Sequence, residues 1–297
     1  MASPALLVNV RTHEAQMGTT TMTAGSLIGF DFWGKPVLSS CESRQNRIEF
    51  IFTAAGLNMP SGTLDVADSL VKNVSVSQPA PATVKININC YFPGPWELDQ
   101  DLGALSRYNV YIKPEPLFSL FAGKVILLDP WIRPQAQGPT GLAEKIVSCD
   151  IARRLARLLG GVKARPHFSL FSPAFPILSP VSVRSGYPCQ AVLSVAVLHK
   201  QIKPRSGFGL LTWPQSEKSI RLGSVLKTNL QAKLPLPLIL DGTTTSRLLK
   251  ELPLPGAVVK AGCISHRIDE GLLRDIDYRQ KVAQGIFNAL REFFAYG

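Results

Sequence analysis

The stretch KVILLDPWIRPQAQGPTGLAEKIVSCDIARRLARLLG, Lys124 to Gly160, decides the fold of the second half of the chain. An apolar run, Val125 to Leu128, ends at Asp129-Pro130, and a loop rich in proline and glycine follows it. Beyond the loop, apolar residues recur with the spacing of one helical face at Ile151, Leu155, Leu158 and Leu159. The pattern predicts a buried strand, a long loop and an amphipathic helix. In α/β proteins such a loop leaves the carboxyl edge of the sheet, where ligands usually bind.

Other parts of the second half carry strand-like or helix-like apolar patterns. They predict strands at Ala191–Leu198 and Ala257–Ala261, and helices at Ser216–Leu230, Thr245–Leu252 and Asp277–Phe294. Between them, residues 165–188 contain five prolines, each of which removes a backbone donor, so an irregular segment is expected there. The set predicts an α/β domain over residues 124–297, with a mostly parallel sheet flanked by helices.

The first 116 residues have the pattern of short strands separated by turns. The predicted strands are Leu6–Val10, Thr19–Thr23, Arg47–Phe52, Val71–Ser77 and Val84–Cys90. Turns rich in glycine and proline lie between them, and several short strands at this spacing are typical of a β-sandwich. We therefore expect a β-sandwich domain over residues 1–116, a linker over residues 117–123 and the α/β domain over residues 124–297.

Composition and charge limit the class of protein. The 297 residues are 45% hydrophobic and 18% charged, which favours globular domains over disorder. A formal net charge of +11 favours polyanionic partners, but the cations do not alternate with aromatic residues, so nucleic acid is not the expected one. The five cysteines are widely spaced and predict buried side chains, not a disulfide framework. No apolar run reaches the roughly 18 residues of a membrane span, and the first residues lack a signal-peptide pattern.

Two long stretches carry a family resemblance. The first contains Asp129-Pro130, Gly138–Leu142, Glu144-Lys145 and Asp150–Leu159, and the second is PGAVVKAGCISHRIDEGLLRDIDYRQKVAQGIFNAL, Pro255 to Leu290. Together they resemble the zinc-dependent N-acetylmuramoyl-L-alanine amidases, which cut the lactyl-amide bond of peptidoglycan, and the resemblance covers about residues 123–294. In the first domain, LDVADSLVKNVSVSQPAPATVKI at Leu64–Ile86 resembles the AMIN domain, a β module that directs envelope amidases to the cell wall.

The resemblance implies a zinc site, but most of its residues are replaced in this chain. In the family, two histidines and a glutamate hold zinc, and a second glutamate is the general base that activates the zinc-bound water. Ile132 and Ala196 stand at the two histidine positions, Glu144 at the ligand glutamate and Lys260 at the general base. Because zinc sites use three or four ligands, Glu144 is expected to be a remnant ligand. We expect no bound zinc and no catalysis by Lys260.

Two functions follow from the resemblance. The first is an amidase homologue of the cell envelope that binds peptidoglycan with impaired hydrolysis; its expected partners are peptidoglycan or an acidic wall polymer, an active amidase, or a division or sporulation protein. The alternative is an active zinc-dependent peptidoglycan amidase with a displaced metal site. Candidate ligands for such a site are His167, His199, Cys263 and His266, which form no HxxxH or HxxE pair. Whether the chain is an enzyme stays open at this point.

The Glu144 and Lys260 positions also predict an ion pair. In the family both carboxylates face the metal, so loss of zinc alone would leave two like charges close together. Lys260 in place of one carboxylate restores neutrality, and we expect its ammonium within about 4 Å of the Glu144 carboxylate. The alternative is a lysine that extends to solvent with its stem against Val259 and Ala261.

Overall fold

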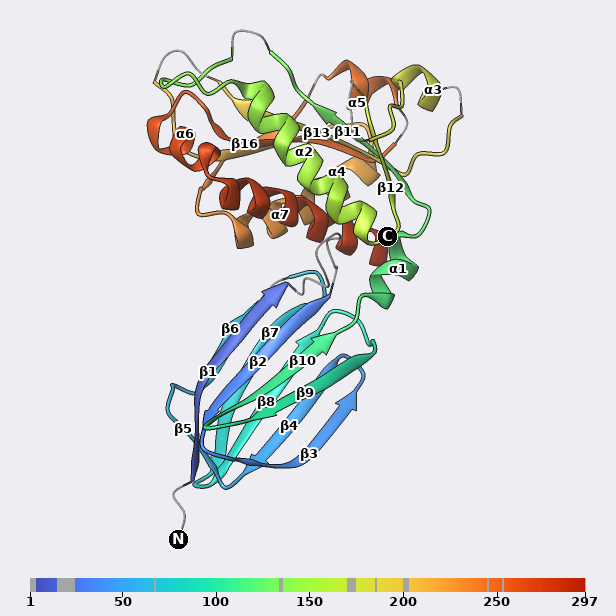
Figure 1. Cartoon of the computed structure of the whole chain (residues 1–297). Helices are drawn as coiled ribbons and strands as arrows, with labels where there is room; N and C mark the ends of the chain where they lie inside the picture. Colours follow the sequence, from blue (N-terminus) through green and yellow to red (C-terminus); the bar gives the residue numbers. More distant parts are fainter. Residues whose placement is uncertain are drawn as a thin grey trace. The chain divides into compact units, whose positions relative to one another are not determined.

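The chain folds into two compact units, Met1–Ser119 and Leu120–Gly297 (Figure 1). The computed structural model describes residues 4–14, 25–66, 68–133, 136–169, 175–184, 186–199, 203–244, 246–252 and 254–296. The division falls inside the expected 117–123 linker, but helix α1, Glu115–Phe121, occupies most of that segment. The strand expected at Thr19–Thr23 lies outside the described residues.

The first unit contains two five-stranded sheets, with strand orders β5-β1-β2-β10-β9 and β3-β4-β8-β7-β6. The strands are β1 Ala5–Glu14, β2 Ser26–Trp33, β3 Val37–Arg44, β4 Arg47–Thr53, β5 Ala55–Leu57, β6 Gly62–Asp65, β7 Val71–Ala80, β8 Thr83–Cys90, β9 Trp96–Leu102 and β10 Leu105–Ile112. Among the described strands every pair is antiparallel except β1 with β5. Each of the predicted strands that the structure describes is present.

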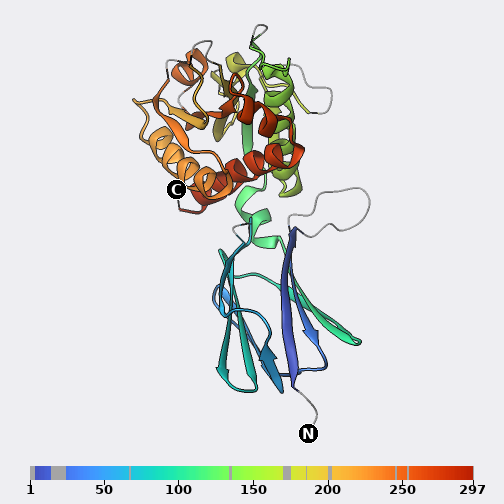
Figure 2. The same ribbon diagram turned by 90° about the vertical axis from the view of Figure 1, so that its left-hand side faces the viewer.

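Aromatic side chains join the two sheets of the first unit. Phe30 and Phe32 of β2 are fully buried against Phe50 and Phe52 of β4, with ring centroids 5.6 Å apart for the pair Phe30–Phe50 and 4.8 Å apart for Phe32–Phe52. Figure 2 shows the two sheets as facing layers. Because successive side chains of a strand point to opposite faces, this packing leaves the other face of β2 and β10 available for polar residues.

The second unit is built on a six-stranded sheet of order β12-β11-β13-β16-β14-β15. The strands are β11 Val125–Pro130, β12 Arg165–Phe168, β13 Ala191–Leu198, β14 Phe208–Thr212, β15 Leu238–Thr243 and β16 Gly256–Cys263. Neighbouring strands are parallel except β14 with β16. The prediction of a mostly parallel sheet is therefore confirmed, and β13 has the predicted bounds.

Helices cover both faces of this sheet. They are α2 Glu144–Gly161, α3 Pro180–Arg184, α4 Glu217–Lys233, α5 Arg247–Glu251, α6 Arg267–Arg274 and α7 Ile276–Ala295. Helix α7 packs against α2 and α4, whereas α3 and α5 lie on the other side of the sheet (Figure 1). The core on the α3 and α5 side contains Leu127 of β11, Ala196 of β13 and Val258 of β16, with Trp131 packed against it.

Proline content misled one prediction for the second unit. The segment 165–188 was expected to be irregular, yet β12 pairs in parallel with β11, and α3 follows within the same segment. Pro166 is tolerated because β12 is an edge strand, where a missing backbone donor costs little.

None of the helices in the described chain is long and apolar enough to cross a membrane.

Candidate functional site

The carboxyl ends of β11, β13 and β16 lie side by side and bring the predicted site residues together. Ala196 of β13 and Lys260 of β16 are direct partners in the strand register. Trp131 follows β11 at once, and its backbone N–H donates to Val195 O of β13. Glu144 enters from the first turn of α2, at the end of the Gly138–Leu142 loop. The parallel arrangement thus places a loop, a helix start and two strand ends at one edge.

Glu144 is completely buried and is held by Arg133. The Arg133 Nε donates to Glu144 Oε2 over 2.7 Å, and Nη2 donates to Oε1 over 2.8 Å. The same Nη2 donates to Val197 O over 2.8 Å, and the Val197 N–H donates to Glu144 Oε1 over 3.1 Å. Hydrogen bonding to Glu144 raises the pKa of the Arg133 guanidinium, against the opposite effect of burial. Glu144 is therefore paired with a cation from the chain itself.

The predicted ion pair between Lys260 and Glu144 is wrong. Across the described residues, the carboxylate of Glu144 forms its salt bridge with Arg133, and none joins it to Lys260. The planar fork of a guanidinium matches both oxygens of a carboxylate, whereas an ammonium is a point donor. Arg133 was missed although it is the only charged residue between Asp129 and Glu144 in the sequence, which is the signal that could have identified it.

Lys260 does not extend into solvent either. Its side chain is mostly buried, and its Nζ lies 4.8 Å from the centroid of the Trp131 ring. Arg133 Cζ lies 5.7 Å from the centroid of the same ring. Burial lowers the pKa of the Lys260 ammonium, and the positive charge of Arg133 lowers it further, against the opposing charge of Glu144. Trp131 therefore lies beside two cations.

These residues do not fit a zinc ion. The Ala196 side chain has no donor atom, and Ile132 offers only an apolar side chain that is 46% exposed. Both oxygens of Glu144 already accept from a guanidinium, whose positive charge opposes a second cation at the same oxygens. Within the described part of the chain, no three histidine, cysteine, aspartate or glutamate side chains are grouped so that they could hold a metal.

The alternative ligands do not gather around Glu144 in the described residues. His167 Nδ1 lies 3.1 Å from Arg165 O, and its ring contacts Tyr187. His266 Nδ1 lies 3.2 Å from Asp269 Oδ1. Cys263 is buried among the strand ends, and no grouping in the described residues joins it or His199 to Glu144 as a metal site.

A second buried carboxylate, Glu270 of α6, fixes the loop before α2. It accepts hydrogen bonds from the Thr140 N–H, the Thr140 hydroxyl and the Leu142 N–H. Burial alone would raise the pKa of the Glu270 carboxyl, but these hydrogen bonds and the charge of Arg274 outweigh it and hold the pKa below its usual value. A Cβ at Gly138 would lie 2.4 Å from Glu270 Oε1, so this close approach requires glycine. Sequence reasoning missed Glu270 because 130 residues separate it from Thr140.

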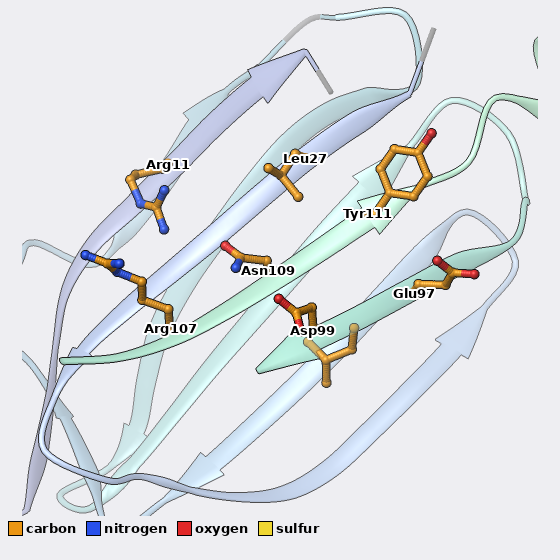
Figure 3. A pocket seen from close by; sticks show the side chains of 8 residues that line it. Arg11, Leu27, Glu97, Asp99, Arg107, Asn109 and Tyr111 are labelled. Atoms are coloured by element: carbon orange, nitrogen blue, oxygen red, sulfur yellow. The ribbon is translucent and has the colours of Figure 1, made fainter. Parts of the chain in front are cut away.

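The first unit has an open pocket of its own, on the face of the β1-β2-β10-β9 strands that points away from the other sheet (Figure 3). Its volume is about 620 Å³, and it is lined by Arg11, Leu27, Glu97, Leu98, Asp99, Arg107, Asn109 and Tyr111. The two arginines face Asp31, with Arg11 Nε at 2.8 Å and Arg107 Nε at 3.9 Å from its oxygens. Lys113 pairs with Glu97. Together with Asp31 and Lys113, the lining has three cations and three acidic residues, so their charges cancel.

The other sheet of this unit carries a basic pocket of about 740 Å³. It is lined by Arg44, Gln45, Asn46, Arg47, Lys72, Asn73, Asn89 and Cys90. Arg44 and Arg47 pair with Glu42 and Glu49, at 2.6 Å and 3.7 Å. Lys72 adds a further positive charge, so this pocket favours an anionic ligand.

Comparison with known proteins identifies the fold of the second unit. No protein-family model matches the chain. It is similar to N-acetylmuramoyl-L-alanine amidase AmiC2 of Nostoc punctiforme (18% identity, TM-score 0.52, covering 59% of this chain and 99% of that chain) and to amidase Ami1 of Mycobacterium smegmatis (18% identity, TM-score 0.52, covering 60% and 99%). The matched part of this chain, 59–60% of its length, has the amidase fold.

Further comparisons agree. The CwlD amidase from Clostridioides difficile, solved in complex with the GerS lipoprotein, has 16% identity and a TM-score of 0.52, covering 59% of this chain and 100% of that chain. Among curated proteins, the probable cell wall amidase LytH from two strains of Staphylococcus epidermidis is 22% identical over 178 residues, 58% of this chain. The match spans 59% of the length of these relatives. The predicted resemblance to N-acetylmuramoyl-L-alanine amidases is confirmed.

Proposed function

We propose that this chain is a peptidoglycan-binding protein of the cell envelope that has the amidase fold but does not hydrolyse peptidoglycan. The observation that carries the proposal is the Arg133 guanidinium on both oxygens of Glu144, the remnant of the family's zinc ligands. The similarity to cell wall amidases supports peptidoglycan as the ligand.

The chemistry of amide hydrolysis argues against activity. A zinc ion supplies a nucleophile by lowering the pKa of bound water from 15.7 to about 7, and it polarises the carbonyl. A lysine with a lowered pKa, such as Lys260, can accept a proton. However, Arg133 and Lys260 are hydrogen-bond donors and not metal ions, so neither lowers the pKa of a bound water as zinc does.

The first unit supports binding to the wall. We propose that it acts as an AMIN-like module and that its neutral pocket holds the sugar chain of peptidoglycan. Tyr111 can stack on a sugar ring while Asn109 and Asp99 bind hydroxyl groups, and the charges of the lining cancel, as suits an uncharged ligand. The basic pocket around Lys72 fits an acidic wall polymer.

A protein partner is part of the proposal. The CwlD amidase was solved in complex with a lipoprotein, which shows that an amidase of this fold can bind another protein. A non-hydrolysing homologue can act in the same way, by binding an active amidase or a division or sporulation protein at the wall.

The test is cosedimentation with purified sacculi, combined with chromatography of the released peptides and with an active amidase as the positive control. We expect the protein to sediment with sacculi and to release no stem peptides. Tyr111→Ala should weaken sedimentation by roughly threefold or more, whereas Tyr187→Ala, an exposed tyrosine of the other unit, should not. Stem-peptide release that Glu144→Ala abolishes would refute the absence of hydrolysis, and failure to sediment would refute wall binding.

A further inference from the structure

The ammonium group of Lys260 has no role in the function proposed above. The Lys260 residue is only 8% exposed, and across the described residues no acceptor or carboxylate lies within bonding distance of its Nζ. The Nζ atom is not among the fully enclosed side-chain polar atoms of the described residues, so it keeps contact with solvent. It is a buried cation that a ligand can still reach.

Arg133 supplies a second donor at the same place. Its Nε and Nη2 are bound to Glu144 and to Val197 O, but the hydrogen bonds of the described residues leave Nη1 without an acceptor. The Arg133 side chain is 40% exposed, in contrast to the fully buried Glu144 side chain. One edge of the guanidinium is therefore fixed and the remaining amine is available.

Trp131 brings the two cations together and adds an apolar surface. Both lie within about 6 Å of its ring centroid, the range of a cation–π contact. Arg133 and Lys260 interact unfavourably as like charges, and a ligand with negative charge between them would remove this repulsion. The ring is partly buried and packs against the core on one side.

The net charge of Arg133, Lys260 and Glu144 indicates which kind of anion would bind beside them. Two cations against the single carboxylate of Glu144 leave one positive charge at this edge. Asp129 accepts from the hydroxyls of Ser169 and Ser194 and is not among the charges that act on the Lys260 ammonium, so it is not counted in this group. One positive charge matches a carboxylate, which carries one negative charge, better than a phosphate group, which carries more.

We propose that Lys260, Arg133 and Trp131 form a binding site for a carboxylate group of a peptide. Lys260 Nζ donates to one carboxylate oxygen and Arg133 Nη1 to the other, while the Trp131 ring covers the apolar atoms next to the carboxylate. The family resemblance implies a metal cation at this position of the fold. In this chain, an anion would bind there instead. The site deepens the proposed function and rests on it for the source of the ligand, which is a stem peptide of peptidoglycan.

The test follows the indole N–H signal of Trp131 by NMR, assigned with Trp131→Phe, during titration of the full chain. The probes are N-acetylalanine and its neutral counterpart N-acetylalaninamide. We expect a saturable shift with the carboxylate and none with the amide at the same concentration. Lys260→Gln should weaken carboxylate binding at least about tenfold, the effect of one charge-assisted hydrogen bond. Lys281→Gln, which removes an exposed lysine of α7, should leave it unchanged.

Three results would overturn the site: an equal shift with the amide, unchanged binding by folded Lys260→Gln, or tighter binding of inorganic phosphate. Sacculus cosedimentation of the same samples separates this inference from the proposed function. If sacculi bind and the carboxylate does not, the site is wrong and the proposed function stands. If the carboxylate binds as expected and sacculi do not, the proposed function is wrong and the site stands.

Discussion

Arg133→Met is the substitution that most directly tests the structure of the second unit. Methionine keeps much of the apolar stem but removes the three donated hydrogen bonds, two to Glu144 and one to Val197 O. Glu144 would then remain fully buried as a charge, and its remaining hydrogen bond within the described residues comes from the Val197 N–H.

The expected loss in the free energy of unfolding depends on how deeply Arg133 and Glu144 are buried. Removing one partner of a buried ion pair costs about 3–5 kcal/mol. Arg133 is 40% exposed, and Glu144 keeps the bond from Val197, so we expect about 2–3 kcal/mol. Glu144→Leu should cost less, about 1–2 kcal/mol, because the unpaired guanidinium can turn toward water. The double variant should recover most of the loss, since it removes both charges.

Native-state hydrogen exchange of the α2 and β13 amides in urea at pH 7 measures these free energies within the second unit. This readout suits a chain with two compact units, for which one global unfolding transition is not assumed. The matched control is Arg153→Met, an exposed arginine of α2, which should stay within about 0.5 kcal/mol of the unsubstituted chain. If Arg133→Met behaves like this control, or if the double variant is less stable than either single one, the pair does not stabilise the unit as argued.

Three further predictions follow from the same edge of the sheet. Lys260→Met should stabilise the second unit by roughly 1–2 kcal/mol, because an unpaired buried ammonium is removed. Since the folded pKa of Lys260 is lowered, this gain in stability is present below the folded pKa. It shrinks as the pH rises toward the ordinary value near 10.4. A loss of urea stability in this variant would contradict the unpaired state. Glu270→Gln should cost about 2 kcal/mol at pH 7. Because the folded pKa of Glu270 is lowered, the difference should begin to decrease below the ordinary value near 4.3 and be lost as the pH falls through the folded pKa. A difference that persists below that pH would show that charge is not its source. The purified protein should contain no stoichiometric zinc by elemental analysis after mild chelation, and one zinc per chain would revive a displaced metal site.

The sequence predicts those parts of the second unit in which one pattern dominates. Ala191–Leu198 is a run of apolar residues buried on both faces, and Asp277–Phe294 repeats its apolar positions with helical spacing, so both match observed elements. Strand β15 was not predicted, because its residues are only partly buried and it lies at the edge of the sheet. In the first unit, β9 was missed for a similar reason, since WELDQDL has few apolar residues and is mostly exposed.

The candidate site was predictable in position but not in its contacts. The family resemblance implied that Ala196 and Lys260 would lie in one site, and they are direct neighbours in the register. The partner of Glu144 depends on the path of the loop after β11, which no periodicity encodes. The sequence shows that Arg133 and Lys260 are cations near the Glu144 position. Only the folded path of the loop determines that Arg133, and not Lys260, forms the salt bridge with Glu144.

The Arg133–Glu144 pair also makes a metal site at this edge of the sheet difficult to gain by single steps in evolution. Gain of histidine at position 132 or 196 brings a new ligand to a carboxylate that a guanidinium already occupies. Loss of Arg133 first leaves Glu144 buried and unpaired, at the cost of about 2–3 kcal/mol estimated above, a large share of the 5–15 kcal/mol that stabilises a typical domain. Each route to a metal site therefore passes through an intermediate that gains nothing or is less stable, so selection on stability alone tends to retain the arginine.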